Sequence, residues 1–595
     1  MKKQLLVLTL VIMLVGMGIS PAIAQTSKGD TLVISSADVQ ETYLNEIIAS
    51  DTTSDGARKH AVYELEPNGW YPISTTIVAG TYDLNIVGGK REEGERRPII
   101  LTTTEFGGWQ MFTAAQDLTF KGIWIMQIDE TPGGNVGQWY RAGVALGSED
   151  QDVVFHDVIF DFNCAFSLFG TQDGLDLHVT NTLMRFSGEP NNIWWNGFGF
   201  DLSTATKLDT VVIQNSTFYQ GHFFLVTTWE TTENLFKFDH NTVVDYTHFP
   251  IHGVHYTNAE FTNNLFVNAF TDGEDSLARV GQDPDGLPYG ILNVDTTYYS
   301  SDTTISGDDT TVTREWKPEM EAERRILVSN NNNFVDSDVK DYWDWAVNYE
   351  NDAGDSLYWD FQVADPTFYD GFMNSRTRAM FEDDATWPEL TLENTTSLDP
   401  AFTNYPDLSD QLIQHSKFFY GADDLEPATI FQDPDGEPLN PTDPMVYDLS
   451  YTNETLLTAS TTGGPVGDLT WFLDNGYNST DVSVANEGIT SVDEPNYAKK
   501  ASKFELSQNY PNPFNPTTTI KYRIINPGKV KLTVYNLLGE KVKTLVNENM
   551  STAGTHKVVW NATDNAGNRV PSGVYFYKLE KKGTGTRMRK MLLIK

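Results

Sequence analysis

The chain has 595 residues, with 82 Asp and Glu against 41 Lys and Arg, which gives a formal net charge of -41 and a pI of about 4.4. Nucleic acids and anionic membrane surfaces attract basic side chains, so this balance excludes both as general partners. Apolar residues make up 39% and charged residues 21% of the chain, a composition that supports large folded cores and differs from that of a disordered protein.

The N-terminus has the parts of a secretory signal peptide. Lys2 and Lys3 precede an apolar run over residues 5–17, and a small-residue cleavage site ends at Ala24. The sequence therefore predicts a signal peptide over residues 1–24 and an exported mature chain. The alternative, an N-terminal membrane anchor, is disfavoured because the apolar run is too short to span a bilayer comfortably.

A repeat follows, in which two apolar residues two positions apart precede a polar residue. Its copies are Val153-x-Phe155-x-Asp157, Leu177-x-Val179-x-Asn181, Val211-x-Ile213-x-Asn215, Phe236-x-Phe238-x-His240, Ala259-x-Phe261-x-Asn263 and Ile326-x-Val328-x-Asn330. The alternation predicts strands with an inward apolar face. Copies without insertions recur every 23–25 residues, which leaves room for three short strands and three turns, the unit of a parallel β-helix.

A second inward column is expected after each turn, formed by Phe166/Leu168, Phe198/Phe200, Phe223/Leu225 and Phe249/Ile251. The competing architecture is an antiparallel β-sandwich, but the turns lack the Asn-Gly and Asp-Gly pairs typical of hairpins. The β-helix is predicted over residues 69–404. Residues 25–68, with a short helix near residues 44–49, are predicted to cap its open end.

From residue 69 to 404 the chain resembles the right-handed parallel β-helix superfamily, often called pectate-lyase-like. The resemblance rests on the repeats and on the phrases Pro98-Ile99-Ile100-Leu101, Asp117-Leu118-Thr119-Phe120-Lys121-Gly122 and Ser397-Leu398-Asp399-Pro400-Ala401-Phe402. It implies a right-handed β-helix and says little about chemistry, because the paired aspartates of polygalacturonases and the Arg signatures of pectate lyases are not found.

Candidate catalytic residues lie on successive rungs of this helix. Aligning the second column places His222 against His248 on an outer face, and Arg185, Tyr219 and Asp245 occupy similar offsets after the first strand of each rung. A base, an acid and a cation together suit β-elimination from an acidic sugar or glycoside hydrolysis. The alternative is an ordinary solvated surface of polar turn residues.

Two acidic insertions are predicted, over residues 272–323 and 336–393. Aromatic residues beside carboxylates in the second insertion suggest contacts to sugar rings by Trp343, Trp345 and Trp359, unless they only pack the insertion onto the helix. The phrase Gln-Asp-Pro-Asp-Gly occurs twice in the chain and offers oxygen ligands for Ca²⁺, or else forms plain surface turns. The candidate ligands are Asp283, Asp285, Asp433 and Asp435.

Residues 405–477 are predicted to close the β-helix domain, and residues 478–503 to form a linker. The remaining module, 504–595, contains short alternating strands typical of a small immunoglobulin-like antiparallel sandwich. Residues 501–595 carry 16 Lys and Arg and 5 Asp and Glu, a net of +11, against -52 for residues 1–500. This contrast indicates two modules with different roles.

The last module resembles the type A C-terminal sorting domain of the type IX secretion system. The matching phrases are Asn509-Tyr510-Pro511-Asn512-Pro513-Phe514-Asn515-Pro516, Asn536-Leu537-Leu538-Gly539-Glu540, Gly573-Val574-Tyr575 and Lys590-Met591-Leu592-Leu593-Ile594-Lys595. The resemblance implies export across both membranes of a Gram-negative bacterium, followed by release or by attachment to surface lipopolysaccharide.

Two functional hypotheses follow for an all-β, monomeric protein that is secreted or held at the cell surface. The first is a polysaccharide lyase or glycoside hydrolase. The second is a non-catalytic surface or adhesion protein that binds glycans or cations, with Ca²⁺ as the candidate ion.

Overall fold

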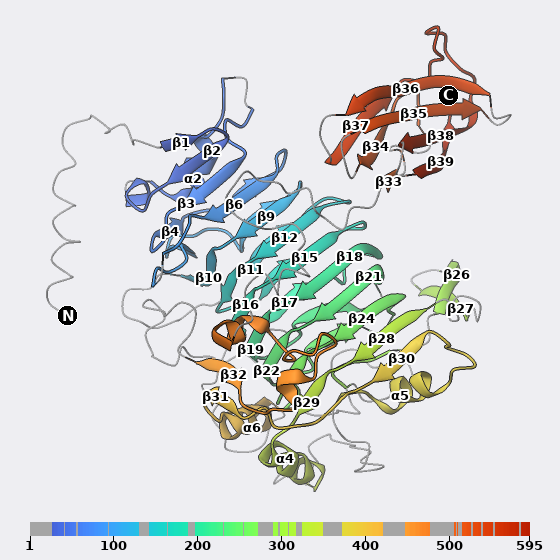
Figure 1. Ribbon diagram of the computed structural model, residues 1–595. Coiled ribbons are helices and arrows are strands. Elements are labelled where there is room, and N and C mark those ends of the chain that lie inside the picture. Colours follow the sequence, from blue (N-terminus) through green and yellow to red (C-terminus); the bar gives the residue numbers. More distant parts are fainter. Residues whose placement is uncertain are drawn as a thin grey trace, which may run out of the picture. The chain divides into compact units, whose positions relative to one another are not determined.

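The computed structural model describes residues 26–475 and 505–594 apart from short gaps, of which the longest are 130–141, 188–196, 272–289, 349–371 and 420–446. The chain divides into two compact units, residues 1–478 and 479–595. The first unit is built from three long parallel sheets and the second from antiparallel strands (Figure 1). The predicted all-β fold class, a parallel β-helix followed by a small antiparallel sandwich, is confirmed.

The first sheet of the β-helix has twelve strands, of which only β1 is antiparallel to its neighbour. In spatial order they are β1 (Thr26–Lys28), β2 (Thr31–Ile34), β3 (Val62–Leu65), β6 (Leu84–Gly88), β9 (Leu118–Lys121), β12 (Asp152–His156), β15 (Asp176–Thr180), β18 (Lys207–Gln214), β21 (Thr232–Asp239), β24 (Asn258–Thr262), β28 (Arg325–Ser329) and β30 (Leu390–Glu393). The sheet thus begins inside residues 25–68, the region predicted as a cap.

The second and third sheets have nine and seven strands. The second contains β4 (Trp70–Ile73), β7 (Ile99–Thr102), β10 (Trp124–Asp129), β13 (Ile159–Asp161), β16 (Leu183–Ser187), β19 (Thr217–Gly221), β22 (Thr242–Tyr246), β25 (Leu265–Val267) and β29 (Asn332–Phe334). The third contains β5 (Ile77–Ala79), β8 (Gln110–Ala114), β11 (Ala142–Leu146), β14 (Phe166–Phe169), β17 (Phe198–Asp201), β20 (Val226–Trp229) and β23 (Ile251–Gly253). A typical rung gives one strand to each sheet.

The polar residue that closes each repeat has a specific backbone role. Its φ angle lies between 48° and 58° in all six copies, namely Asp157, Asn181, Asn215, His240, Asn263 and Asn330. This left-handed region is strained for most side chains but accessible to Asn, Asp and Gly. The polar residue of each repeat therefore marks the corner at which a first-sheet strand ends and the chain bends toward the second sheet.

The next position along the chain forms a buried asparagine ladder that the pattern did not predict. Asn264 accepts a hydrogen bond from the backbone N–H of Asn241 at 2.9 Å and donates to the carbonyl of Phe238 at 2.9 Å. Its own backbone N–H donates to Asn331 Oδ1 at 3.0 Å. Each side chain thus satisfies backbone groups that the bend removes from the strand ladder.

Helices and the remaining strands decorate the β-helix. Near its N-terminal end lie η1 (Asp38–Gln40) and α2 (Leu44–Ser50), and α2 packs Leu44, Ile47 and Ile48 into the core. Later elements are β26 (Tyr298–Ser306) and β27 (Asp309–Trp316), which form a hairpin, then α4 (Ser337–Asn348), α5 (Ser375–Glu382) and β31 (Phe402–Asn404). In the described part of the chain, no helix combines the length and apolarity needed to cross a membrane.

Residues 405–475, here named the closing segment, contain α6 (Ser409–Phe419), β32 (Asp448–Tyr451), η2 (Leu456–Thr458) and η3 (Leu469–Asn475). This segment lies against the second sheet (Figure 1). Its Tyr451, Leu456 and Phe472 form one buried cluster with outward side chains of that sheet, such as Trp124 and Val244. The inward side chains of the same strands belong to the main core.

The second unit is an antiparallel sandwich. One sheet contains β33 (Glu505–Leu506), β34 (Thr518–Ile524) and β37 (Gly554–Trp560), and the other contains β36 (Lys541–Met550), β35 (Gly528–Asn536), β38 (Gly573–Lys581) and β39 (Gly585–Leu593). Trp560, Tyr577 and Leu579 are fully buried between the sheets. Along β38 buried residues alternate with half-buried ones, as expected of a strand with one face against the core.

The asparagine ladder yields a stability prediction. Asn264→Ala should lower the free energy of unfolding by about 2–3 kcal/mol, because it leaves the Phe238 carbonyl and the Asn241 N–H without partners in a buried corner. The midpoint of thermal unfolding measures the effect. Asn234→Ala is the matched control, since Asn234 is an exposed asparagine whose amide donates to Asp209. Equal midpoints for the two variants would contradict the ladder's role.

Candidate functional site

Two of the predicted residues, Arg185 and Tyr219, form a buried polar cluster with Asp161 on the outer face of the second sheet. Asp161, Arg185 and Tyr219 stand in register on β13, β16 and β19. Arg185 donates through Nε to Asp161 Oδ1 at 2.6 Å and through Nη2 to Oδ2 at 2.8 Å, and Trp124 Nε1 donates to Oδ2 at 2.8 Å. Burial opposes the charge of Arg185, but the Asp161 carboxylate outweighs it and holds the guanidinium pKa above its usual value.

Asp245 belongs to a different position from the one predicted. The register partner of Tyr219 is Val244, and Asp245 follows it in the left-handed conformation, with a φ of 55°. The Asp245 carboxylate accepts a hydrogen bond from the hydroxyl of Tyr405 in the closing segment. Burial raises the pKa of Asp245 to about 7, with a further upward contribution from Asp336.

The two histidines differ from the prediction by a one-residue slip. Phe198 and Phe200 pair with Phe166 and Leu168 as expected, but Phe200 then pairs with Val226 rather than Leu225. His222 consequently meets Thr247, with Nδ1 and Oγ1 2.9 Å apart, instead of stacking on His248.

The ring of His248 stacks on Phe223, with centroids 4.9 Å apart and planes within 5°. Burial among these rings lowers the pKa of His248 to about 3. The neutral imidazole is therefore the stable form at ordinary pH. A neutral ring packed on phenylalanine is typical of a core residue.

The expectation of an exposed catalytic face is corrected by these contacts. The exposed fractions of Arg185, Tyr219, His222, Asp245 and His248 are 3%, 1%, 0%, 2% and 7%. For Arg185, Tyr219 and Asp245 the cause is the closing segment, which covers the outer face of the second sheet. His222 and His248 are buried among phenylalanine rings such as Phe223. A polymer cannot reach side chains buried in this way, and the Arg185–Asp161 pair has the geometry of an anchor between neighbouring rungs.

The predicted sugar-binding tryptophans have packing roles where they are described. Trp343 is buried and donates through Nε1 to the carbonyl of Thr271 at 2.9 Å. Trp345 stacks with Tyr342 and lies under the ammonium of Lys417, 4.2 Å from the ring centroid. These contacts agree with the alternative in which the aromatics attach α4 to the rest of the unit. Trp359 lies outside the described residues.

The predicted calcium ligands Asp283, Asp285, Asp433 and Asp435 also lie outside the described residues, as does Ala24. In the described part of the chain, no group of three or more His, Cys, Asp and Glu side chains is placed to hold a metal ion. The Ca²⁺ hypothesis therefore stays a prediction.

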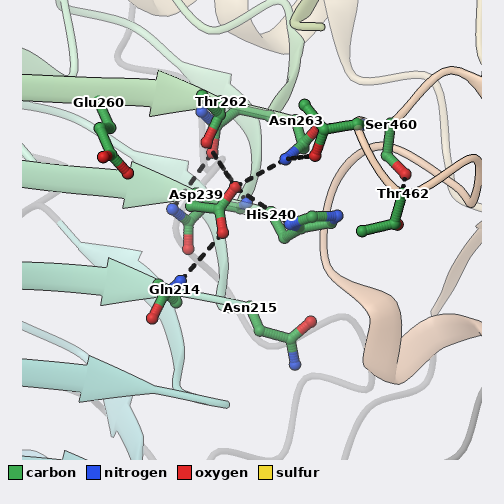
Figure 2. A network of polar contacts seen from close by, with 12 residues as sticks. Gln214, Asn215, Asp239, His240, Glu260, Thr262, Asn263, Ser460 and Thr462 are labelled. Atoms are coloured by element: carbon green, nitrogen blue, oxygen red, sulfur yellow. Dashed lines mark hydrogen bonds and ion pairs between the residues drawn. The ribbon is translucent and has the colours of Figure 1, made fainter. Parts of the chain in front are cut away.

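A polar network that the sequence did not indicate lies at the first corner, where Asp239 is the centre (Figure 2). Asp239 accepts hydrogen bonds from Gln214 at 2.9 Å, Thr262 at 2.6 Å and Asn263 at 2.8 Å, and its Oδ1 lies 3.1 Å from Nδ1 of His240. Although burial acts in the opposite direction, these donors hold the carboxyl pKa well below its usual range. The signal in the sequence was positional, because Gln214, Asp239 and Thr262 each directly precede a left-handed corner residue.

The same corner fastens the closing segment. Thr461 donates its backbone N–H to Asn263 Oδ1 at 2.8 Å, and Gly467 donates to the carbonyl of Asn263 at 2.7 Å. Asp468 accepts a hydrogen bond from Thr217 at 2.6 Å, and burial raises the Asp468 pKa to about 6. Several consecutive rungs are therefore tied to one distant stretch of chain.

In the second unit, two described residues of the predicted sorting motif, Asn509 and Phe514, pack into the sandwich. The backbone N–H of Asn509 donates a hydrogen bond to Tyr577 Oη at 2.8 Å, and Phe514 is buried against Trp560. Phe514 also bridges β39 through backbone hydrogen bonds with Leu592 and Ile594. Asn515 and Pro516 are exposed, and residues 510–513 lie outside the described part.

Comparisons with known proteins describe mainly the second unit. A protein-family model described as the FlgD Ig-like domain matches residues 521–585, which accords with the sandwich. No curated protein matches the chain.

One solved structure comes from work titled "Structural and functional probing of PorZ, an essential bacterial surface component of the type-IX secretion system of human oral-microbiomic Porphyromonas gingivalis". The match has 22% sequence identity and a TM-score of 0.12, over 15% of this chain and 11% of that chain. This chain thus spans only a small part of that protein's length, and a likeness of this extent carries no conclusion about function.

The buried ion pair yields a prediction that separates an anchor from a catalytic group. Arg185→Leu should lower the free energy of unfolding by about 3–5 kcal/mol, because it strands the Asp161 carboxylate in an apolar site. Arg91→Leu is the control: Arg91 pairs with Asp157 at a half-buried site and should cost about 1 kcal/mol or less. Chemical denaturation measures both, and an unaltered stability of Arg185→Leu would refute the anchoring role.

The raised carboxyl pKa values predict a pH dependence. In the folded protein Asp245 keeps its proton to about pH 7, whereas its ordinary pKa is 3.8. Its contribution to stability is therefore complete below pH 3.8 and is lost as the pH rises through 7. Buried His248 and His252, with pKa values lowered to about 3, act in the opposite sense below pH 6.5.

A difference measurement isolates the carboxyl. Asp245→Asn should match the wild type near pH 4, and at pH 8 it should be more stable by on the order of 3 kcal/mol, since the amide mimics the protonated acid. Denaturation curves of both proteins at the two pH values give the difference. A pH-independent difference would show that Asp245 is ionised in the folded state.

Proposed function

We propose that this chain is an exported surface protein whose β-helix binds an extracellular polysaccharide without cleaving it, and whose second unit is a type IX sorting domain. The observation that carries the non-catalytic form is the burial of every predicted catalytic side chain: Arg185, Tyr219 and Asp245 lie beneath the closing segment, and His222 and His248 lie among phenylalanine rings. A buried Arg–Asp pair and histidines packed on phenylalanine have no access to a polymer.

The division of the surface supports a binding role. The closing segment covers the apolar outer face of the second sheet. On the third sheet, by contrast, large apolar side chains remain in contact with solvent, with exposed fractions of 59% for Val78 in β5 and 45% for Trp109 just before β8. Exposed apolar groups on a folded protein often mark a contact surface. The chain's acidity disfavours a nucleic acid there.

Two features support the sorting role of the second unit. It forms a compact unit of its own. It is also basic, whereas the rest of the chain is strongly acidic. A separate domain at the end of the chain suits an export signal that is read independently of the cargo.

Export is tested with a fusion of residues 479–595 to a secreted reporter. In a Gram-negative host that has a type IX system, the reporter should reach the cell surface or medium, and in an isogenic strain without the system it should stay in the periplasm. Equal localisation in both strains would remove the sorting role. Cell fractionation and a protease-accessibility assay give the measurement.

Binding without cleavage is tested on the purified protein with a panel of neutral and acidic polysaccharides. Retardation in affinity electrophoresis should occur without new reducing ends and without the ultraviolet absorbance of unsaturated uronates. Release of either product would favour the second candidate function, a lyase or hydrolase, whose catalytic groups would then lie outside the buried cluster.

A further inference from the structure

We infer that the outer face of the third sheet carries a binding subsite for a neutral sugar ring, formed by Trp109 and Phe169 and supported by Phe166, which packs against the core. This inference rests on the proposed glycan-binding function and names the site and the ligand class. It differs from the sequence prediction, which placed sugar contacts in the second insertion.

Register fixes which side chains face outward. Val78, Thr113, Ala145 and Phe169 align across β5, β8, β11 and β14. Their inward neighbours, such as Leu168, belong to the main core. Because side chains alternate along a strand, this column lies on the outer face, where Val78 is exposed, Thr113 and Phe169 are half-buried and Ala145 is buried.

Aromatic rings gather at one end of this column. Trp109 directly precedes β8 and meets Phe169 edge to face, with ring centroids 4.9 Å apart. Its centroid lies 6.2 Å from that of Phe166, which stacks on Phe198 at 4.9 Å. Trp109 is held in place by rings that reach the core, yet 45% of it is exposed. The ring is thus rigidly presented and not merely loose on the surface.

Polar groups flank these rings in the way that a sugar requires. Gln110 donates to Thr113 Oγ1 at 3.2 Å beside the tryptophan. Asp201 follows Phe200, the partner of Leu168, and so occupies the next rung beyond Phe169. Its Oδ1 accepts from Ser203 Oγ at 2.6 Å. A pyranose has an apolar ring face for the aromatic rings and peripheral hydroxyls for such amide and carboxylate groups.

Size and charge select this occupant. A stable protein partner needs roughly 800 Å² on each side, whereas an aromatic side chain offers about 150–250 Å² when wholly accessible, and the rings of Trp109 and Phe169 are partly covered. The area suits one or two sugar rings. The rings and Thr113 carry no charge, and the nearest titratable group in the column is the Asp201 carboxylate. In a module with a net charge of -52, a polyanionic glycan is repelled and a neutral one is not.

The test uses the purified protein with Trp109→Ala, Trp109→Phe and, as a matched control, Trp387→Ala, which removes another half-buried tryptophan. The probes are glucan, mannan, xylan and galactan as neutral polymers, with polygalacturonate and alginate as acidic ones. The wild type should bind at least one neutral polymer. Trp109→Ala should lower that affinity about tenfold or more, Trp109→Phe should keep most of it, and Trp387→Ala should leave it unchanged. Near-ultraviolet circular dichroism and thermal midpoints confirm that each variant is folded.

The outcomes separate the subsite from the wider function. Neutral-glycan binding that survives Trp109→Ala overturns the subsite and leaves the binding function intact. Binding confined to the acidic polymers overturns the neutral ligand class. Absence of binding by the wild type to all six polymers overturns both the subsite and the proposed binding function.

Discussion

The apolar outer face of the second sheet is the constraint on which the first unit depends. A solenoid buries its inward side chains by stacking its rungs, but that stacking does nothing for side chains that point outward. Here Trp124, Met126, Val244 and Val267 point outward and would expose a wide apolar strip. The closing segment removes this strip from water. The burial of Arg185 and Asp245 follows from the same cover.

The cover also explains the chemistry of the polar groups beneath it. Arg185 stays charged because Asp161 lies against it in a two-point contact. The Asp245 carboxylate accepts a hydrogen bond from the hydroxyl of Tyr405, a neutral group. Burial therefore dominates, and the pKa of Asp245 rises. Asp239, with four donors around it, moves the other way. Partner chemistry, more than depth, decides the protonation state of each carboxyl.

Much of the fold could be predicted because its determinants are local and periodic. Alternating apolar residues and the corner residue, such as Asn181 or Asn263, recur with each rung and need a left-handed backbone. The site could not be predicted in the same way. Whether Tyr219 faces water depends on the segment around Asp468, and Thr217, two residues earlier, meets Asp468 across 251 positions. No local pattern reports such a contact.

The prediction that His222 stacks on His248 was wrong because of a shift of one residue. Aligning the two His-Phe phrases gives an offset of 26 residues, whereas Gly221 pairs with Tyr246 and Val226 with Ile251, an offset of 25. His222 therefore meets Thr247 and not His248. A period of two gives no tolerance to such a slip. The large aromatic content of this turn hid it, because Phe223 and Phe224 are both buried and either fits the inward pattern.

The closing segment has a consequence for the way the protein folds. An array of rungs coupled only to its neighbours can fray from its ends, one rung at a time. The contacts of residues 461–469 with Asn215, Thr242 and Asn263 join several rungs at once, over separations of about 200 to 250 residues. Contacts of such range form late and slowly. Once they are made, the joined rungs open together, so that a repetitive array acquires the cooperativity of a globular domain.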